Sequence, residues 1–183
     1  TLCCIPETAM GKSQLIIKED GVLAGVEMAK RIFHDFDPEL KMTVFIQDGA
    51  EVKKGDIAFV VEGKIQSLLQ TERLMLNVMQ RMSGIATYTH RMAAALVGTK
   101  TVLVDTRKTT PGMRVFEKAA VEIGGGSNHR YNLSTAVMLK DNHIDAAGGV
   151  TRAIEMARAH ASFTTTVEIE CENLSMVREA VEA

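Results

Sequence analysis

The fold of this chain is decided by the stretch from Asp105 to Ile144, which reads DTRKTTPGMRVFEKAAVEIGGGSNHRYNLSTAVMLKDNHI. It holds a group of cationic and imidazole side chains: Arg107, Lys108, His129, Arg130 and Lys140. Bringing several positive groups together costs free energy unless a negative group lies among them. The stretch therefore predicts that a small, multiply charged anion binds here.

Strands and helices alternate around these residues. Apolar runs predict strands at 101–104, 136–139 and 165–169, and helices are expected at 112–123, 150–161 and from Leu174 onward, with Asn173 as an N-cap. This alternation predicts a parallel sheet, in which the carboxyl ends of all strands share one face. Four charged side chains follow the strands: Arg107, Lys108, Lys140 and Glu170. We expect these four to meet at one mouth.

The first part of the chain has a different pattern, and we expect it to form a domain of its own, residues 1–98, with 99–183 as the second domain. Strands are expected at 14–17, 42–46 and 57–61, and helices at 22–33 and 67–97, the second ending at Gly98. The long helix carries Arg73 and Arg81, and for Arg81 the sequence favours a solvated position or an ion pair with Glu72. Residues 48–63 resemble the turns of a biotinyl carrier domain, but their two adjacent lysines favour plain scaffold.

Composition excludes several classes of protein. The 183 residues have a net charge of −2, which argues against a nucleic-acid partner, and no segment is long and apolar enough to cross a membrane. The three cysteines, Cys3, Cys4 and Cys171, lack metal-ligand spacing and favour a reducing, cytoplasmic setting. The motifs of zinc sites, serine nucleophiles and Walker-type nucleotide sites are absent.

Each candidate site residue also has a structural interpretation. Arg107 and Lys108 could be exposed loop charges, and His129 could be a hydrogen-bonded structural histidine. The run Gly124–Gly126 could cradle a phosphate through its amides or could simply end a helix. Glu170 could be a strand residue paired with a lysine. Because Arg107 and Lys108 are adjacent cations at a strand end, a functional role is favoured for both. His129 is a better ligand candidate because it lies next to Arg130.

These motifs resemble the quinolinate phosphoribosyltransferase family, also called carboxylating nicotinate-nucleotide pyrophosphorylases. The matching segments are KEDGVLAG at 18–25, TERLMLNVMQRMSGIAT at 71–87, DTRKTTPG at 105–112, GGGSNHR at 124–130, KDNHI at 140–144 and VEIECEN at 167–173. They stand in the family's order and cover nearly the whole chain. A related protein of molybdate-transport operons shares the fold but is less similar at NHR and KDNH.

The resemblance implies an α/β fold, with an N-terminal α/β sandwich followed by a partial β/α barrel of parallel strands. It implies phosphoribosyl transfer from phosphoribosyl pyrophosphate to quinolinate with Mg²⁺ and decarboxylation. The carboxylates of quinolinate would be bound by Arg107, His129, Arg130 and Lys140. Lys108 would lie near the phosphates and Glu170 near the ribose and its metal, so that Lys140, Glu170 and Lys108 take part in catalysis. Arg73 matches an arginine that is lent to a neighbouring subunit, which implies a homodimer or a higher homo-oligomer.

Only three strand–helix units fit between Thr101 and Ala183, whereas a barrel of this type usually needs roughly 250 residues. We therefore expect the chain to be a fragment that lacks the C-terminal part of a longer protein. Two alternative functions remain. One is a non-catalytic module that binds dicarboxylates or other anions, and the other is an oligomer scaffold whose cations form salt bridges between subunits.

Overall fold

A three-stranded antiparallel sheet and two helices form the core of the first part of the chain. The computed structural model describes residues 1–183, which divide into two units, Thr1–His129 and Arg130–Ala183. In the first unit the strands are β1 (Met10–Ile16), β5 (Ile57–Lys64) and β3 (Lys41–Val44), and they lie in the order β1-β5-β3. All three expected strands are thus present, each with shifted ends.

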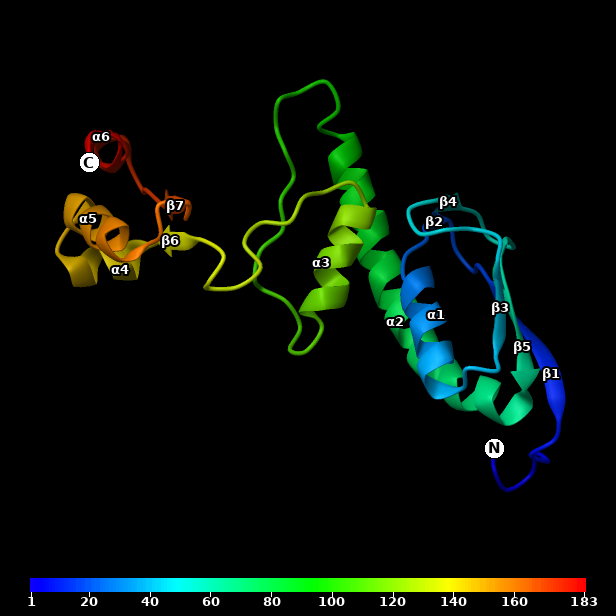
Figure 1. Ribbon diagram of the computed structural model, residues 1–183. Coiled ribbons are helices and arrows are strands. Elements are labelled where there is room, and N and C mark those ends of the chain that lie inside the picture. The colour runs from blue at the N-terminus through cyan, green and yellow to red at the C-terminus, as the bar shows by residue number, and fades with distance from the viewer. The chain divides into compact units, whose positions relative to one another are not determined.

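Two helices cover this sheet, α1 (Val26–Phe36) and α2 (Ile65–Ala94) (Figure 1). Phe33 of α1 meets Phe59 of β5 edge to face, with ring centroids 6.3 Å apart. The apolar side chains of the helices and of β5 form one buried cluster. Burial of this apolar area is the main force that holds the helices to the sheet.

The start of α1 differs from the prediction. Val22 belongs to a short strand, β2 (Gly21–Val22), which pairs with β4 (Glu51–Val52), and the helix begins only at Val26. Gly25 has a φ of 103°, which favours glycine, and the carboxylate of Asp48 accepts hydrogen bonds from the amides of Val26 and Glu27 at 2.8 and 3.2 Å. A distant side chain therefore caps the helix.

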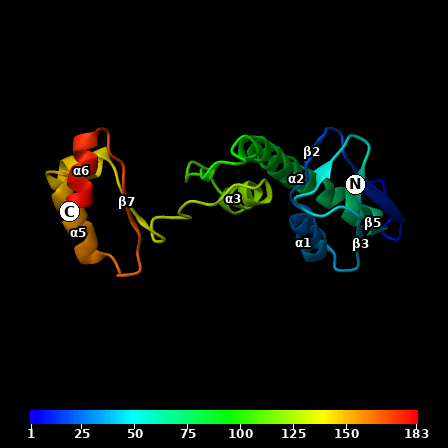
Figure 2. The same cartoon turned by 90° about the horizontal axis from the view of Figure 1, so that it is seen from above.

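Helix α2 runs without a break through Ser83 and Gly84 and ends at Ala94, earlier than the expected end before Gly98. Its middle packs on α3 (Arg114–Ile123), and Figure 2 shows these two helices from above. The expected helix at 112–123 is therefore confirmed with a later start. The expected strand at 101–104 is wrong: only Val104 pairs, through one parallel bridge to Ser127. Val102 and Val104 are 65% and 49% exposed, so no neighbouring strand or helix covers this segment enough to make it a sheet strand.

The second unit contains the parallel pairing that the sequence predicts. Strands β6 (Val137–Leu139) and β7 (Val167–Ile169) run in parallel, with Leu139 opposite Ile169. Three helices accompany them: α4 (Asp141–Ala147), α5 (Val150–His160) and α6 (Leu174–Glu182). The side chain of Asn173 accepts a hydrogen bond from the Met176 amide, so the predicted N-cap is confirmed. The α/β class is confirmed, whereas the domain division at residue 98 stays a prediction.

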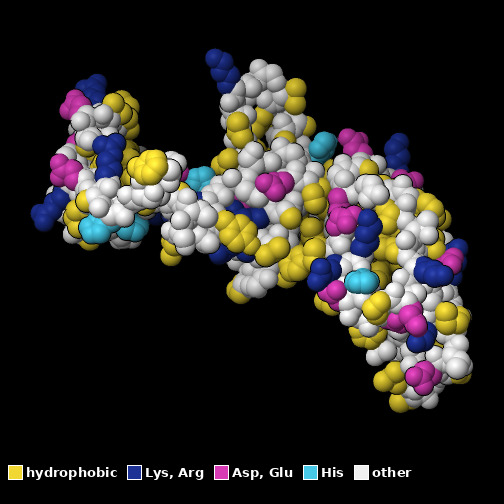
Figure 3. Space-filling view, viewed as in Figure 1, with side chains coloured by type: hydrophobic (Ala, Val, Ile, Leu, Met, Phe, Trp, Pro, Cys, Tyr) yellow, Lys and Arg dark blue, Asp and Glu magenta, His cyan; other side chains and the backbone are white.

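Helix α4 was missed by the sequence analysis. Its first turn is fixed because the Lys140 amide donates to Nδ1 of His143 at 3.1 Å, and Gly148, with a φ of 89°, ends it. No helix of the chain has the length and apolarity needed to span a bilayer. On the face drawn in Figure 3, the Lys and Arg side chains of each unit are interspersed with Asp and Glu, in keeping with the small net charge.

Candidate active site

Arg107 and Lys108 lie in the loop that joins Val104 to α3. Lys108 is exposed, and its amide donates to the Thr106 hydroxyl at 3.1 Å. Arg107 is half-buried, and its Nη1 is a buried nitrogen without a hydrogen-bond partner. A buried donor without an acceptor destabilises the fold by about 1–3 kcal/mol, and by more if it is charged, so its presence calls for an explanation. A bound anion that accepts a hydrogen bond from Nη1 would explain it.

Hydrogen bonds with side chains of α3 hold this loop in place. The Arg114 guanidinium donates to the Thr109 hydroxyl at 3.2 Å and to the Arg107 carbonyl at 3.4 Å. Glu117 accepts from the Thr110 amide at 3.1 Å. These contacts fix the backbone around Arg107 without using its guanidinium.

Glu117 also forms an ion pair with Arg81 of α2. The Arg81 Nη2 lies 2.5 Å from Oε1 of Glu117 and 2.7 Å from the Thr110 hydroxyl. Burial alone raises the pKa of Glu117, but the hydrogen bonds from Arg81 and Thr110 outweigh it, so this pKa lies below its ordinary value. Of the two interpretations of Arg81, the ion pair with Glu72 is wrong. The side chain of Arg81 is 49% exposed and pairs with Glu117, and through this pair it supports the loop.

The three glycines before His129 end a helix. The amides of Gly124, Gly125 and Gly126 donate to the carbonyls of Ala120, Glu122 and Val121, each at 3.0 Å. These amides are thus occupied, which leaves the helix C-cap interpretation and removes the phosphate cradle. Glycine is also required by packing, because a Cβ on Gly124 would lie 2.4 Å from the Ala86 carbonyl oxygen of α2.

His129 is half-buried at the end of this segment. Its amide donates to Oδ1 of Asp105 at 2.8 Å, which joins the histidine to the residue that precedes the cationic loop. Within the first unit, the structure therefore ties His129 to the same framework as Arg107. Arg73 lies elsewhere on α2, exposed to solvent.

In the second unit, Lys140 and Glu170 stand at the carboxyl ends of the paired strands β6 and β7, as the parallel pattern predicts. The Lys140 Nζ lies 2.5 Å from Oε1 of Glu170, and their side chains are 41% and 53% exposed. The structural interpretation of Glu170 as a partner of a lysine is thus observed. Arg130 is half-buried, and its Nη2 lies 3.3 Å from the Met138 sulfur.

The predicted site residues are distributed over both units. The first contains Arg73, Arg107, Lys108 and His129, and the second contains Arg130, Lys140 and Glu170. Their meeting at one mouth stays a prediction. No motif in the sequence marks Lys118, Glu117 and Arg114 of α3, and charged residues on a helix usually face solvent, so these three were not predicted.

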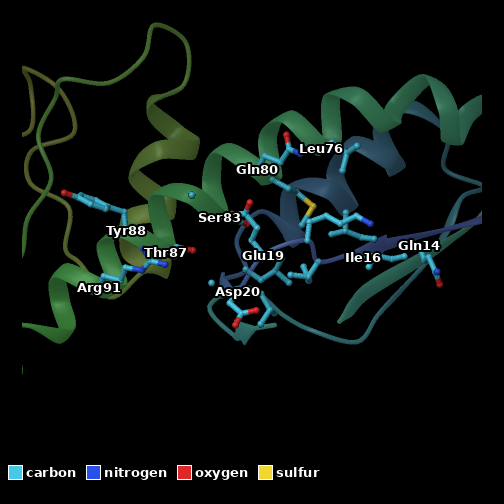
Figure 4. Close-up of a pocket in the computed structure, with 18 residues that line it drawn as sticks. Gln14, Ile16, Glu19, Asp20, Leu76, Gln80, Ser83, Thr87, Tyr88 and Arg91 are labelled. Carbon is cyan, nitrogen blue, oxygen red and sulfur yellow. The ribbon is translucent and has the colours of Figure 1, made fainter. Parts of the chain in front are cut away.

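A cavity in the first unit is lined by none of these cations. It has a volume of about 850 Å³ and is formed by β1, the turn after it and α2 (Figure 4). Its polar lining includes Glu19, Gln80, Ser83 and Arg91. Ser83 is already engaged, since its hydroxyl bonds to the amide and carbonyl of Ala24 at 3.0 and 3.1 Å. We place the candidate site at the cations because their donors, not this cavity, offer anion-binding chemistry.

The structure contains no group of three or more His, Cys, Asp or Glu side chains placed to hold a metal ion. Mg²⁺ commonly keeps several waters and binds through one or two carboxylates together with substrate phosphates. Glu170, exposed at the end of β7, fits such a site as a single carboxylate ligand. The residues therefore suit Mg²⁺ that arrives with a pyrophosphate group.

Comparison with known proteins agrees with the motifs. Residues 1–83 match the quinolinate phosphoribosyl transferase N-terminal domain, and residues 85–183 match the C-terminal domain of the same family. A probable carboxylating nicotinate-nucleotide pyrophosphorylase of Synechocystis sp. is 43% identical over 171 residues, which is 93% of this chain and 58% of the relative. One of Archaeoglobus fulgidus is 49% identical over 158 residues, covering 85% of this chain and 59% of the relative.

Solved structures give the same result. NadC from Streptococcus pyogenes superposes with a TM-score of 0.93 at 44% identity, covering 98% of this chain and 64% of that one. The nicotinate-nucleotide pyrophosphorylase from Francisella tularensis superposes with a TM-score of 0.91 at 35% identity, covering 97% and 63%. The chain spans about three fifths of the length of these proteins. Because the N-terminal and C-terminal domains of the family both match, in that order along the chain, the chain belongs to the quinolinate phosphoribosyltransferase family.

Proposed function

We propose that the protein transfers the phosphoribosyl group of phosphoribosyl pyrophosphate to quinolinate and decarboxylates the product. The products would be nicotinate mononucleotide, pyrophosphate and carbon dioxide, a step of NAD biosynthesis. The observation that carries the proposal is Nη1 of Arg107, a buried donor without a protein acceptor in the loop DTRKTTPG. Arginine binds a carboxylate through two parallel hydrogen bonds, which suits a dicarboxylate substrate.

The substrate carboxylates would be bound by Arg107, His129, Arg130 and Lys140. Lys108 would take the phosphate side, where a flexible, exposed ammonium suits a phosphate oxygen. Lys140 would have to exchange its partner Glu170 for a substrate carboxylate. Both side chains are about half exposed, and exposed ion pairs contribute only about 0–1 kcal/mol, so the exchange costs little.

In the first step the pyridine nitrogen donates its electron pair to the anomeric carbon, while the bond to pyrophosphate breaks and its electrons leave with the oxygen. Positive charge builds on the ribose ring, and a Glu170 carboxylate released from Lys140 would stabilise it. Lys108 would stabilise the leaving pyrophosphate. Bound Mg²⁺ would supply further charge for the leaving group.

In the second step the bond between the ring and the carboxylate next to the nitrogen breaks. Carbon dioxide leaves, the electron pair stays on the ring carbon beside the pyridinium nitrogen, and that carbon then takes up a proton. Desolvation of the departing carboxylate favours this step. The half-buried position of Arg107 would help to exclude water there.

We also infer a homodimer or a higher homo-oligomer in which Arg73 enters the neighbouring subunit's site. We further infer a reducing, cytoplasmic setting, which is consistent with the three free cysteines.

The sharing of Arg73 can be tested by mixing two variants. Arg73→Ala and Arg107→Ala should each remove turnover, because both sites of a homodimer of either variant lack one arginine. Mixing the two variants should restore a part of it, because hybrid dimers contain one complete site. Mixtures that stay inactive would contradict the sharing of Arg73.

The function is tested by titrating the intact gene product with quinolinate and with phosphoribosyl pyrophosphate, each alone, and then by measuring nicotinate mononucleotide when both are present with Mg²⁺. An enzyme should bind both and form product. A non-catalytic anion module should bind quinolinate only, and a scaffold whose cations join subunits should bind neither.

A further inference from the structure

Lys118 of α3 is the most deeply buried charged residue of the chain, with 2% of its surface exposed. Its Nζ lies 2.7 Å from both carboxylate oxygens of Asp105, whose side chain is 9% exposed. Nζ also donates to the carbonyl of His129 at 3.3 Å. All three donors of the ammonium therefore have an acceptor within the protein.

This ion pair joins two segments that carry proposed substrate-binding residues. Asp105 lies two residues before Arg107, and its Oδ1 also accepts from the His129 amide at 2.8 Å. Lys118 and Asp105 thus hold the backbone of His129 at both its amide and its carbonyl. The backbone bridge between Val104 and Ser127 joins the same two segments, and this cluster adds the contacts that hold His129 itself.

Stability alone is a weak reason for such a pair. Replacing a buried ion pair by apolar side chains of similar size is often neutral or stabilising, by about 1–4 kcal/mol, because both charges must be desolvated. The pair instead fixes geometry. The two Asp105 oxygens, the three N–H donors of Lys118 and the backbone of His129 are held in one arrangement. Lys118 is also too fully engaged to bind a substrate itself.

We propose that Lys118 is a positioning residue, which through Asp105 sets the spacing between Arg107 and His129 that the two carboxylates of quinolinate require. This inference rests on the proposed function. It predicts that the cluster affects the binding of quinolinate, which uses groups of both segments, more than the binding of phosphoribosyl pyrophosphate, which uses only Lys108 of the Arg107 segment.

The test is the double variant Asp105→Asn with Lys118→Met in the intact gene product. It removes both charges together, so no unpaired charge stays buried, and the amide side chain introduced by Asp105→Asn keeps an oxygen that can accept from the His129 amide. Lys118→Met alone would leave the Asp105 carboxylate without its cation, and we expect it to be much less stable than the double variant. Circular dichroism and thermal unfolding would show which variants fold.

We expect the double variant to raise the KM for quinolinate on the order of tenfold to a hundredfold, which corresponds to the loss of one hydrogen bond to a charged group, about 1.5–3 kcal/mol. The KM for phosphoribosyl pyrophosphate should rise by a smaller factor, because only Lys108 of this segment serves it and its side chain is flexible and exposed. A purely structural role would lower the fraction of active protein, and hence kcat, with both KM values unchanged. The matched control is Ser67→Ala, which removes a buried hydrogen bond to Asp37 of 2.6 Å elsewhere in the same unit. It should lower stability and leave both KM values as they are.

The outcomes separate the two proposals. If the wild type neither binds quinolinate nor forms product, the proposed function fails, and the role of Lys118 falls with it. If the wild type is active and the folded double variant has a wild-type KM for quinolinate, the positioning role alone is overturned. Should the double variant not fold, Asp105→Asn is measured in the same way, with the same expected rise and the same contradicting result.

Discussion

Arg107→Ala tests the proposed anion site most directly. The substitution removes a guanidinium whose Nη1 is buried without a protein acceptor. A hydrogen bond to a charged group contributes about 1.5–3 kcal/mol, and a fork makes two of them. Taking the low end for each bond, the loss is about 3 kcal/mol, which weakens quinolinate binding about a hundredfold, since each 1.4 kcal/mol is a factor of ten.

The fold should not suffer from this change. The backbone of residue 107 keeps its contacts, because the Arg107 carbonyl accepts from the Thr109 amide at 2.8 Å and from Arg114 at 3.4 Å. We therefore expect the free energy of unfolding of the unliganded protein to stay the same or to rise by up to about 1–3 kcal/mol, because the substitution removes a buried donor that has no partner.

The assay is isothermal titration with quinolinate, together with urea unfolding of each variant. Arg107→Lys keeps the charge but loses the fork, so it should recover only a part of the affinity. Lys108→Ala, one residue away, is the matched control and should weaken phosphoribosyl pyrophosphate rather than quinolinate. An Arg107→Ala variant that binds quinolinate as the wild type does would refute the assignment of the dicarboxylate site to this loop.

Two further predictions concern the framework around the loop. In the folded state the pKa of Glu117 lies below its ordinary value of 4.5, so its ion pair stabilises the fold when the pH is above 4.5. This stabilisation is lost as the pH falls through the lower pKa of the folded state. Acid unfolding should therefore be less steep in Glu117→Gln, and equally steep curves would contradict the pairing with Arg81. Gly124→Ala would place a Cβ 2.4 Å from the Ala86 carbonyl oxygen and should cost about 1–3 kcal/mol in thermal or urea unfolding. Gly84→Ala, where nothing lies within 4 Å of the added Cβ, should instead stabilise α2 by about 1 kcal/mol, and equal effects at both glycines would refute the packing argument.

Local patterns predicted the elements that bury one clear face. The parallel strands β6 and β7 and the helices α5 and α6 were found because their apolar residues form the runs and stripes typical of these elements. The start of α1 could not be found in this way. Val22 continues the apolar stripe of the helix, yet it pairs in β2, and the cap of the helix comes from Asp48, which is 22 residues away from Val26.

The segment 101–104 shows the limit of the same reasoning. TVLV has the composition of a buried strand, but a strand needs neighbours, and only Val104 pairs. Composition describes what a segment can do, whereas sheet formation depends on partners far away in the sequence. The short helix α4 was missed for a related reason: its apolar content is low, and His143 supports its first turn through a single side-chain contact.

Three carboxylates each pair with one cation, and only one of these cations, Lys140, is a predicted site residue. The pairs are Asp105 with Lys118, Glu117 with Arg81 and Glu170 with Lys140. The first two carboxylates are buried or nearly so, and they engage cations that serve the framework. Nη1 of Arg107 is left without such a partner.

This arrangement separates two kinds of positive charge. A cation whose hydrogen bonds are all made within the protein holds geometry and cannot also bind a substrate, and Lys118 is of this kind. A cation with an unsatisfied buried donor gains most from an external anion, because the cost of desolvation is already part of the folded state. Lys140 is intermediate between these two kinds of cation, because its ion pair with Glu170 is half exposed and can exchange at little cost. In the proposed reaction, a quinolinate carboxylate that binds Lys140 would release the Glu170 carboxylate. The released carboxylate would then stabilise the positive charge that builds on the ribose in the transition state.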